Sequence, residues 1–188
     1  MAKMISEPLI LNRTIKEIDD IFGCNRLVEE SFVPELNYLK ACIKESFRLH
    51  PFLAFNVPHV SLKDTIVAGY FVPKGSHVLL SRLGLGRNPN VWKDPMRFNP
   101  DRHLVNIGKE VVLSDHDLRI LSLIGTGKRG CLGVILGSTI TTMLIARMIQ
   151  GFAWETPHNE PKIKLVESHD NLHLAKPLVV VYALCYLE

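Results

Sequence analysis

The chain has 188 residues, 47% of them hydrophobic, and its 22 basic and 19 acidic side chains give a net charge of +3 at pH 7. This length suffices for one hydrophobic core of ordinary domain size. The charge is too small and too scattered along the sequence for a nucleic-acid-binding surface, so we exclude nucleic acid as a partner. The four cysteines show no paired spacing, which favours free thiols over disulfides.

The first segment, residues 1–22, has the pattern of an amphipathic helix. Its apolar residues recur at the three- and four-residue intervals that place side chains on one helix face. These residues are Leu11, Ile15, Ile18 and Phe22. Gly23 follows directly and ends the predicted helix, because glycine readily adopts the backbone conformation found after helix C-termini.

Residues 34–51 predict a second helix. Pro34 suits a first helical turn, where its missing N–H costs nothing, and Pro51 prevents the helix from continuing. The apolar positions again have helical spacing, at Leu36, Leu39, Ile43 and Phe47. Glu45 and Arg48 share one face, where a solvated ion pair worth well under ~1 kcal/mol is the simplest interpretation.

The middle of the chain predicts two strands followed by a long connection. Residues 65–72 and 76–80 have the composition of strands, and the turn residues Pro73 and Gly75 between them predict a β-hairpin. The stretch 88–106 is rich in proline and asparagine. It predicts a long irregular connection, which is unusual inside a compact domain unless it has a function.

The most informative stretch surrounds Cys131. Residues 125–130 contain three glycines, which allow the backbone to approach a flat ligand closely. The next segment, residues 132–152, is apolar enough to form a buried helix. Cys131 would thus lie at a helix N-terminus, where unpaired N–H groups and the helix dipole stabilise an anion such as a thiolate. Arg129 adds a planar guanidinium that suits a carboxylate.

The same stretch permits other interpretations. Residues 125–130, from Gly125 to Gly130, also fit the G-x-G-x-x-G pattern of a dinucleotide-binding turn, but no acidic residue follows about 20 positions later, where a ribose ligand is expected. Residues 132–152 are long enough to span a membrane, for which ~20 residues are needed, yet hydroxyl side chains and an arginine interrupt them. His169 and His173 have metal-pair spacing without a third ligand, which favours surface histidines.

The pattern G-x-R-x-C-x-G, from Gly127 to Gly133, resembles the haem-ligand loop of the cytochrome P450 superfamily. The resemblance implies haem b as the cofactor and Cys131 as the axial ligand of the haem iron, with Arg129, Gly127 and Gly133 around it. A thiolate ligand donates electron density that favours O–O cleavage. Ile124 stands where the superfamily usually has phenylalanine, so we expect altered packing near the sulfur.

A second motif of the superfamily lies upstream. In its members, E-x-x-R on a central helix is followed by a P-E-R-type segment, and here Glu45 and Arg48 are followed by Arg102 in the sequence N-P-D-R-H. Asp101 replaces the commoner glutamate and His103 the commoner phenylalanine. The resemblance implies a structural triad in which Glu45 is held between Arg48 and Arg102 beneath the haem loop. A buried triad of this kind specifies an arrangement more surely than it adds stability.

Finer similarities point to one plant group of the superfamily. Residues 34–51, 69–77, 86–95 and 174–178 resemble members that N-hydroxylate amino acids and yield aldoximes, the entry step to glucosinolates and cyanogenic glucosides. The resemblance implies O₂-dependent monooxygenase chemistry, a small-molecule substrate such as an amino acid, and NADPH-cytochrome P450 reductase as the redox partner. It also implies that His59 offers a cation or donor to a haem propionate.

The expected fold is mainly α with small β-sheets, an α+β arrangement that corresponds to the C-terminal haem-binding part of the cytochrome P450 fold. We expect residues 1–188 to form a single partial domain that begins at the helix after the family's long oxygen-side helix. The N-terminal anchor, which holds family members at the endoplasmic reticulum membrane facing the cytosol, and the acid–alcohol pair that delivers protons to O₂ would lie outside this chain.

These absences lead to expectations about location and activity. The location that we expect for this chain is either cytosolic or unknown. We expect the isolated chain to retain haem poorly and to show no turnover. A non-catalytic degenerate fragment with at most an interaction role is the remaining alternative beside the dinucleotide-binding module.

Overall fold

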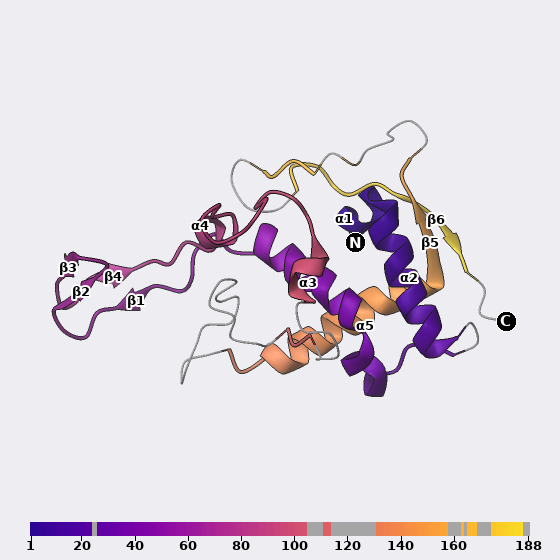
Figure 1. Ribbon diagram of the computed structural model, residues 1–188, viewed down its shortest axis with the longest axis horizontal. Coiled ribbons are helices and arrows are strands. Elements are labelled where there is room, and N and C mark those ends of the chain that lie inside the picture. Colours follow the sequence, from indigo (N-terminus) through magenta and orange to yellow (C-terminus); the bar gives the residue numbers. More distant parts are fainter. Residues whose placement is uncertain are drawn as a thin grey trace.

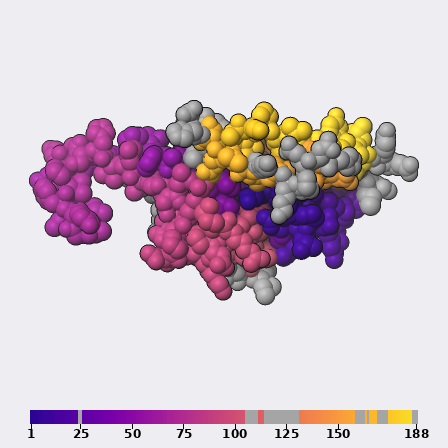
Figure 2. All heavy atoms as spheres, turned by 90° about the horizontal axis from the view of Figure 1, so that it is seen from above, coloured from indigo at the N-terminus to yellow at the C-terminus, as the bar shows by residue number. Residues whose placement is uncertain are grey.

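The chain combines a helical body, an extended arm of short strands and a two-stranded C-terminal sheet beside the body (Figure 1). The computed structural model describes residues 1–23, 26–104, 111–113, 131–157, 163, 165–168 and 174–185. A space-filling view shows the arm projecting beyond the body (Figure 2). Helices with small two-stranded sheets confirm the expected α+β fold.

The body contains helices α1 (Ala2–Ser6), α2 (Pro8–Phe22), α3 (Asn37–Leu49) and α5 (Val134–Gly151), together with the 3₁₀ helix η1 (Glu30–Glu35). Helix α3 is central and contacts both α2 and α5 (Figure 1). The apolar faces of these helices meet in one core. Its most deeply buried members include Ile18, Val28, Leu36, Leu39 and Ala146.

The N-terminal segment forms two helices, so the single predicted helix over residues 1–22 is wrong. Glu7 interrupts it with φ −128° and ψ 82° because it precedes Pro8, and a residue before proline is disfavoured in the helical conformation. Gly23 does end α2, at φ 68°. Pro34 does not open α3 but lies inside η1, and α3 begins at Asn37.

The arm contains strands β1 (His59–Val60), β2 (Thr65–Val67), β3 (Tyr70–Val72) and β4 (His77–Val78). Strand β2 pairs with β3, and β1 pairs with β4, in both cases antiparallel. The predicted hairpin, which paired residues 65–72 with 76–80, is therefore wrong. The two ladders instead lie one after the other along the arm.

The reason for the different pairing is a tight turn inside the predicted first strand. Ala68 and Gly69 have φ values of 50° and 84°. Two consecutive positive φ values suit the two-residue turns that join twisted antiparallel strands. The predicted turn after Pro73 also forms, with Ser76 N–H donating to the Pro73 carbonyl at 3.2 Å, but it leads from β3 into β4.

Short elements connect the arm to the body. Helix α4 (Arg82–Gly86) follows the arm, and the 3₁₀ helix η2 (Pro100–His103) ends an otherwise irregular stretch, in agreement with the predicted connection. After α5, strand β5 (Phe152–Glu155) pairs antiparallel with β6 (Val181–Leu184). The order of elements brings η2 and α4 against α3, and this packing builds the first part of the site.

Candidate functional site

The carboxylate of Glu45 is the centre of a buried cluster between α3 and η2. Arg48 Nη2 and Nε donate to its two oxygens at 2.8 Å each, and Arg102 Nε donates at 3.0 Å. The Glu45 and Arg48 side chains are both 0% exposed. The simple interpretation as a solvated ion pair is therefore wrong, and the three side chains form the arrangement that the resemblance implies.

Two further donors complete what we call the Glu45 cluster (Glu45, Arg48, Asn99, Arg102 and His103). His103 Nε2 lies 2.8 Å from Glu45 Oε2, and the backbone N–H of Asn99 donates to Oε1 at 2.9 Å. Burial raises the pKa of Glu45, but the hydrogen bonds from Arg48, His103 and Asn99 outweigh it and lower the pKa to about 2. The carboxylate is thus ionised at neutral pH.

His103 is neutral in this setting. Its side chain is 3% exposed, and burial lowers its pKa more than the hydrogen bond to Glu45 raises it. A neutral ring that faces an ionised carboxylate carries its proton on Nε2 and donates it. Sequence comparison marked His103 only as a substitution for phenylalanine, so its role as a donor to Glu45 was missed.

The arginines of the cluster also hold the irregular connection. Arg48 donates to the carbonyls of Gly86 and, at 2.8 Å, of Pro95, while Arg102 donates to Lys93 at 2.9 Å. The Arg48 and Arg102 guanidinium carbons lie 5.1 and 5.7 Å from the centre of the Trp92 ring. Each arginine therefore satisfies backbone carbonyls that have no sheet or helix partner.

Cys131 lies at the start of α5 and borders an open cavity. Its side chain is exposed, and Gly133 is the N-cap residue of α5. The cavity has a volume of about 250 Å³. Beside Cys131, its lining includes Phe47, Phe52, Leu113, Val134, Gly137 and Thr141. A mostly apolar space thus adjoins one sulfur atom.

The first turn of α5 lies beside Cys131, whose sulfur is 4.0 Å from the position of a Cβ at Gly133. The helix has 18 residues, and within the described part of the chain no side chain caps its first turn. Its first backbone N–H groups and the positive end of its dipole are therefore directed toward the loop that carries Cys131. Arg129 and Gly127, which the resemblance places around a haem, lie outside the described residues, as do Gly125, Gly130, Ile124, His169 and His173.

Helix α5 is apolar on two opposite sides. One side packs into the core through Thr142, Ala146 and Ile149. The other is exposed, with Ile135, Leu136, Ile140 and Leu144 all 47% exposed or more. By length and composition, α5 is the one helix of the described chain that is apolar enough to cross a membrane, with 17% of it buried. Its packing against α2 and α3 favours a core helix with one uncovered side.

These features fit a haem held through Cys131. The sulfur is exposed, the cavity beside it is lined with aromatic and aliphatic side chains, and a Cβ added at Gly137 would meet no atom within 4 Å. Space for a flat apolar group therefore exists along the start of α5. His59, by contrast, is exposed on β1 in the arm and does not line this cavity, so its contact with a propionate stays a prediction.

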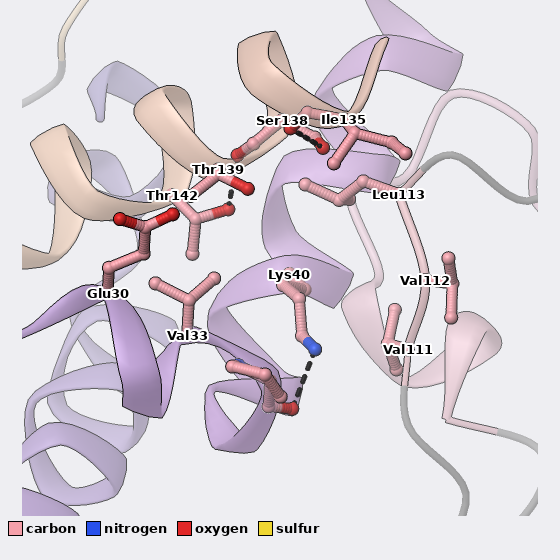
Figure 3. A pocket seen from close by; sticks show the side chains of 11 residues that line it. Glu30, Val33, Lys40, Val111, Val112, Leu113, Ile135, Ser138, Thr139 and Thr142 are labelled. Carbon is pink, nitrogen blue, oxygen red and sulfur yellow. Dashed lines mark hydrogen bonds between the residues drawn. The ribbon is translucent and has the colours of Figure 1, made fainter.

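A second cavity of about 270 Å³ lies between η1, α3 and α5 (Figure 3). Two of its polar groups are already hydrogen-bonded: Thr142 Oγ1 donates to the Ser138 carbonyl within α5 at 2.8 Å, and Lys40 Nζ of α3 donates to the Pro34 carbonyl of η1 at 2.7 Å. Across the described residues, no group of three or more His, Cys, Asp or Glu side chains is placed to hold a metal ion. The Cys131 cavity is thus the stronger candidate.

Comparison with known proteins identifies the family. A sequence profile of the cytochrome P450 family matches residues 1–181. The chain belongs to the cytochrome P450 family. This result confirms the family recognised from the sequence motifs, and it favours the haem interpretation of residues 125–130 over a dinucleotide-binding turn.

Individual relatives refine the comparison. The chain is 56% identical over 181 residues to tryptophan N-monooxygenase 1 of Arabidopsis thaliana, covering 96% of this chain and 33% of the relative. It is 51% identical over 180 residues to tyrosine N-monooxygenase of Sorghum bicolor, covering 96% and 32%. A solved zebrafish cytochrome P450 with abiraterone superposes with a TM-score of 0.82 and 26% identity, covering 98% of this chain and 42% of that one.

The chain spans about a third of the length of these curated relatives. The similarity includes both the Glu45 cluster and Cys131, because the matched region runs through residue 181.

Proposed function

We propose that this chain provides the thiolate-ligand side of a haem b monooxygenase site, with Cys131 as the axial ligand of the iron. One observation carries the proposal: an exposed cysteine at the start of α5 borders an apolar cavity in a chain of the cytochrome P450 family. The exposed side of α5 continues this apolar surface beyond the sulfur.

Each group of residues has a separate task in this proposal. Cys131 would hold the iron, Gly133 and Gly137 leave room along α5, and Phe47 and Phe52 line the cavity beside the sulfur. Arg129, Gly127 and His59 complete the cofactor contacts as the resemblance predicts. Haem held in this way supplies activation of O₂ for the insertion of one oxygen atom. The Glu45 cluster does not take part in chemistry; it fixes α3, from which Phe47 projects.

The reaction that we propose is N-hydroxylation of an amino acid, leading to an aldoxime. Support comes from relatives that are named N-monooxygenases of tryptophan, tyrosine, phenylalanine, isoleucine and valine, at 50–56% identity. Since these names cover aromatic and aliphatic amino acids, the shared substrate class is the amino acid itself. NADPH-cytochrome P450 reductase is the proposed electron donor.

The 188-residue chain alone is expected to bind haem weakly and to show no turnover. The reason is the exposed side of α5, where Ile135 is 71% exposed and Leu136 66%. The described residues cover the sulfur from one side, and turnover needs an enclosed site that excludes water.

Haem binding tests the proposal directly. The purified chain is titrated with hemin, reduced and exposed to CO, and the absorption spectrum is compared with that of Cys131→Ser. We expect a red-shifted thiolate band in the wild-type chain and its loss in the variant. Cys185→Ser, which removes another exposed thiol, is the matched control and should keep the band. An identical spectrum in Cys131→Ser would refute the ligand assignment.

A further inference from the structure

A second polar group, which is only partly buried, joins three segments that are distant in sequence. Glu167 belongs to the C-terminal segment, where it forms an isolated β-bridge with Leu174. Its carboxylate accepts hydrogen bonds from Arg87 Nη2 and, at 3.3 Å, from Arg87 Nη1. The same carboxylate lies 2.9 Å from His50 Nδ1. Arg87 follows α4 and His50 follows α3, so Glu167 connects the ends of both helices with the C-terminal segment.

Arg87 also holds the last carbonyl of α3. Its Nε and Nη2 donate to Leu49 O at 3.0 and 2.7 Å. Carbonyls in the last turn of a helix lack intrahelical partners, and a cation there interacts favourably with the helix dipole. One guanidinium therefore fixes the end of α3 and the C-terminal segment at the same time.

The protonation states follow from the same geometry. The hydrogen bonds from Arg87 lower the pKa of Glu167, so it is ionised. Burial lowers the pKa of His50, although Glu167 opposes this; Arg87 and Lys3 are the cations that act on the ring. His50 is thus neutral and donates from Nδ1. Its Nε2 is buried and has no hydrogen-bond partner in the described chain, which is tolerable for a ring nitrogen without a proton.

The interacting side chains of Arg87, His50 and Glu167 are connected to the Cys131 cavity by a short, conformationally restricted stretch of backbone. Pro51 has a fixed φ, and Phe52 follows it and lines the cavity beside Cys131. The Arg82 guanidinium lies 5.2 Å from the Phe52 ring centre, and the backbone N–H of Arg82 donates to Ala54 O at 2.9 Å. Hydrogen bonds thus hold the backbone at Leu49 on one side of Phe52 and at Ala54 on the other, while the Phe52 side chain itself is 57% exposed.

We infer that Arg87, His50 and Glu167 form a latch that positions Phe52 beside the thiol of Cys131. The three are positioning residues, because they act through the backbone and not on the ligand. The inference rests on the proposed function only for its consequence in haem binding. The position of Phe52 relative to Cys131 can be measured without any cofactor.

The first experiment uses the cofactor-free chain in a Cys24→Ser, Cys185→Ser background. A nitroxide label is attached to Cys131; Cys42 stays unlabelled because it is buried and burial raises its pKa to about 12. Broadening of the Phe52 amide signal in the NMR spectrum then reports its distance from the label. We expect strong broadening in this background, clear weakening in Glu167→Ala and a smaller change in Glu167→Gln, which keeps an acceptor for His50.

The second experiment measures the hemin affinity of the same Glu167 variants, without the nitroxide label on Cys131. Loss of the latch should weaken it by about fivefold, the scale of one partly buried ion pair. The matched control is Asp101→Asn, which breaks the exposed Arg13–Asp101 pair of 2.6 Å and should change neither readout. Glu167→Gln replaces Glu167→Ala should the latter fail to fold by circular dichroism.

The outcomes separate the two proposals. Unchanged Phe52 broadening in both Glu167 variants would overturn the latch. A wild-type chain that takes up no hemin would overturn the proposed function, while the broadening would still decide the latch.

Discussion

The Glu45 cluster and the outer side of α5 differ in how completely their groups are paired. The Glu45 carboxylate is 0% exposed and accepts hydrogen bonds from two guanidinium groups, an imidazole and a backbone N–H. On α5, Ile135 and Leu136 are at least 66% exposed. The support of the site is thus complete within this chain, whereas the surface beside the sulfur is open. Stability and ligand binding should therefore respond to different substitutions.

The largest effect is expected in the paired region. Glu45→Ala should lower the free energy of unfolding by about 3–5 kcal/mol, because it leaves Arg48 and Arg102 buried without their carboxylate. Urea denaturation followed by circular dichroism measures the change. Glu35→Gln alters an exposed carboxylate and should stay within about 0.5 kcal/mol. Equal effects of the two substitutions would show that the cluster does not stabilise the fold.

Two glycines differ in the space around them: Gly86 is tightly packed against α3, whereas Gly137 lies on the open part of α5. A Cβ at Gly86 would lie 2.2 Å from the Arg48 backbone oxygen, so Gly86→Ala should cost about 1–3 kcal/mol of stability. A Cβ at Gly137 would meet nothing within 4 Å, so Gly137→Ala should gain about 0.5–1 kcal/mol through its higher helix propensity. The same substitution should weaken hemin binding, because its methyl group enters the cavity. Thermal melts and hemin titrations of both variants test whether Gly86→Ala lowers stability, and whether Gly137→Ala raises stability while it weakens hemin binding.

The smallest effect concerns pH. Because the pKa of His103 is lowered in the folded chain, the unfolded state binds a proton that the folded state does not once the pH falls below about 6.5. Stability contributed by neutral His103 is therefore lost as the pH falls from neutral toward its folded pKa. His103→Phe should remove this slope, so its stability relative to wild type rises by up to about 1 kcal/mol between pH 7.5 and 5.5. A pH-independent difference would contradict the neutral, buried state of His103.

Glu45 itself should not titrate in that window. Its pKa of about 2 lies below the usual value for a glutamate, so the stability that it contributes is present above about pH 4.3 and is lost only toward pH 2. The slope between pH 7.5 and 5.5 thus does not come from the carboxylate of the cluster.

Sequence motifs predicted the three charged members of the Glu45 cluster better than they predicted the elements that bury it. Residue spacing placed Glu45 and Arg48 on one helix face, and the family motif added Arg102, but spacing alone could not show that the pair is buried. Burial depends on η2 and α4, which pack onto α3 from distant parts of the chain. His103 and Asn99 were missed as partners for the same reason.

Strand pairing was the weakest prediction. Alternation and composition identify residues that can form strands, but they do not state which strands meet. Ala68 in a left-handed conformation is rare for a residue with a Cβ, and that unusual turn redirected the hairpin. The break at Glu7, in contrast, had a visible signal in Pro8, because proline restricts the residue before it.

The arm has a consequence for handling the protein. Within the described chain its two ladders contain two strands each, so every strand there has one side with backbone N–H and C=O groups that no neighbouring strand takes up. Ile66 and Phe71 beside these edges are 71% and 67% exposed. Open, apolar strand edges are templates for pairing with another chain. Self-association of the purified protein should therefore begin at this hairpin, and a lysine at Ile66 is the substitution with which to suppress it.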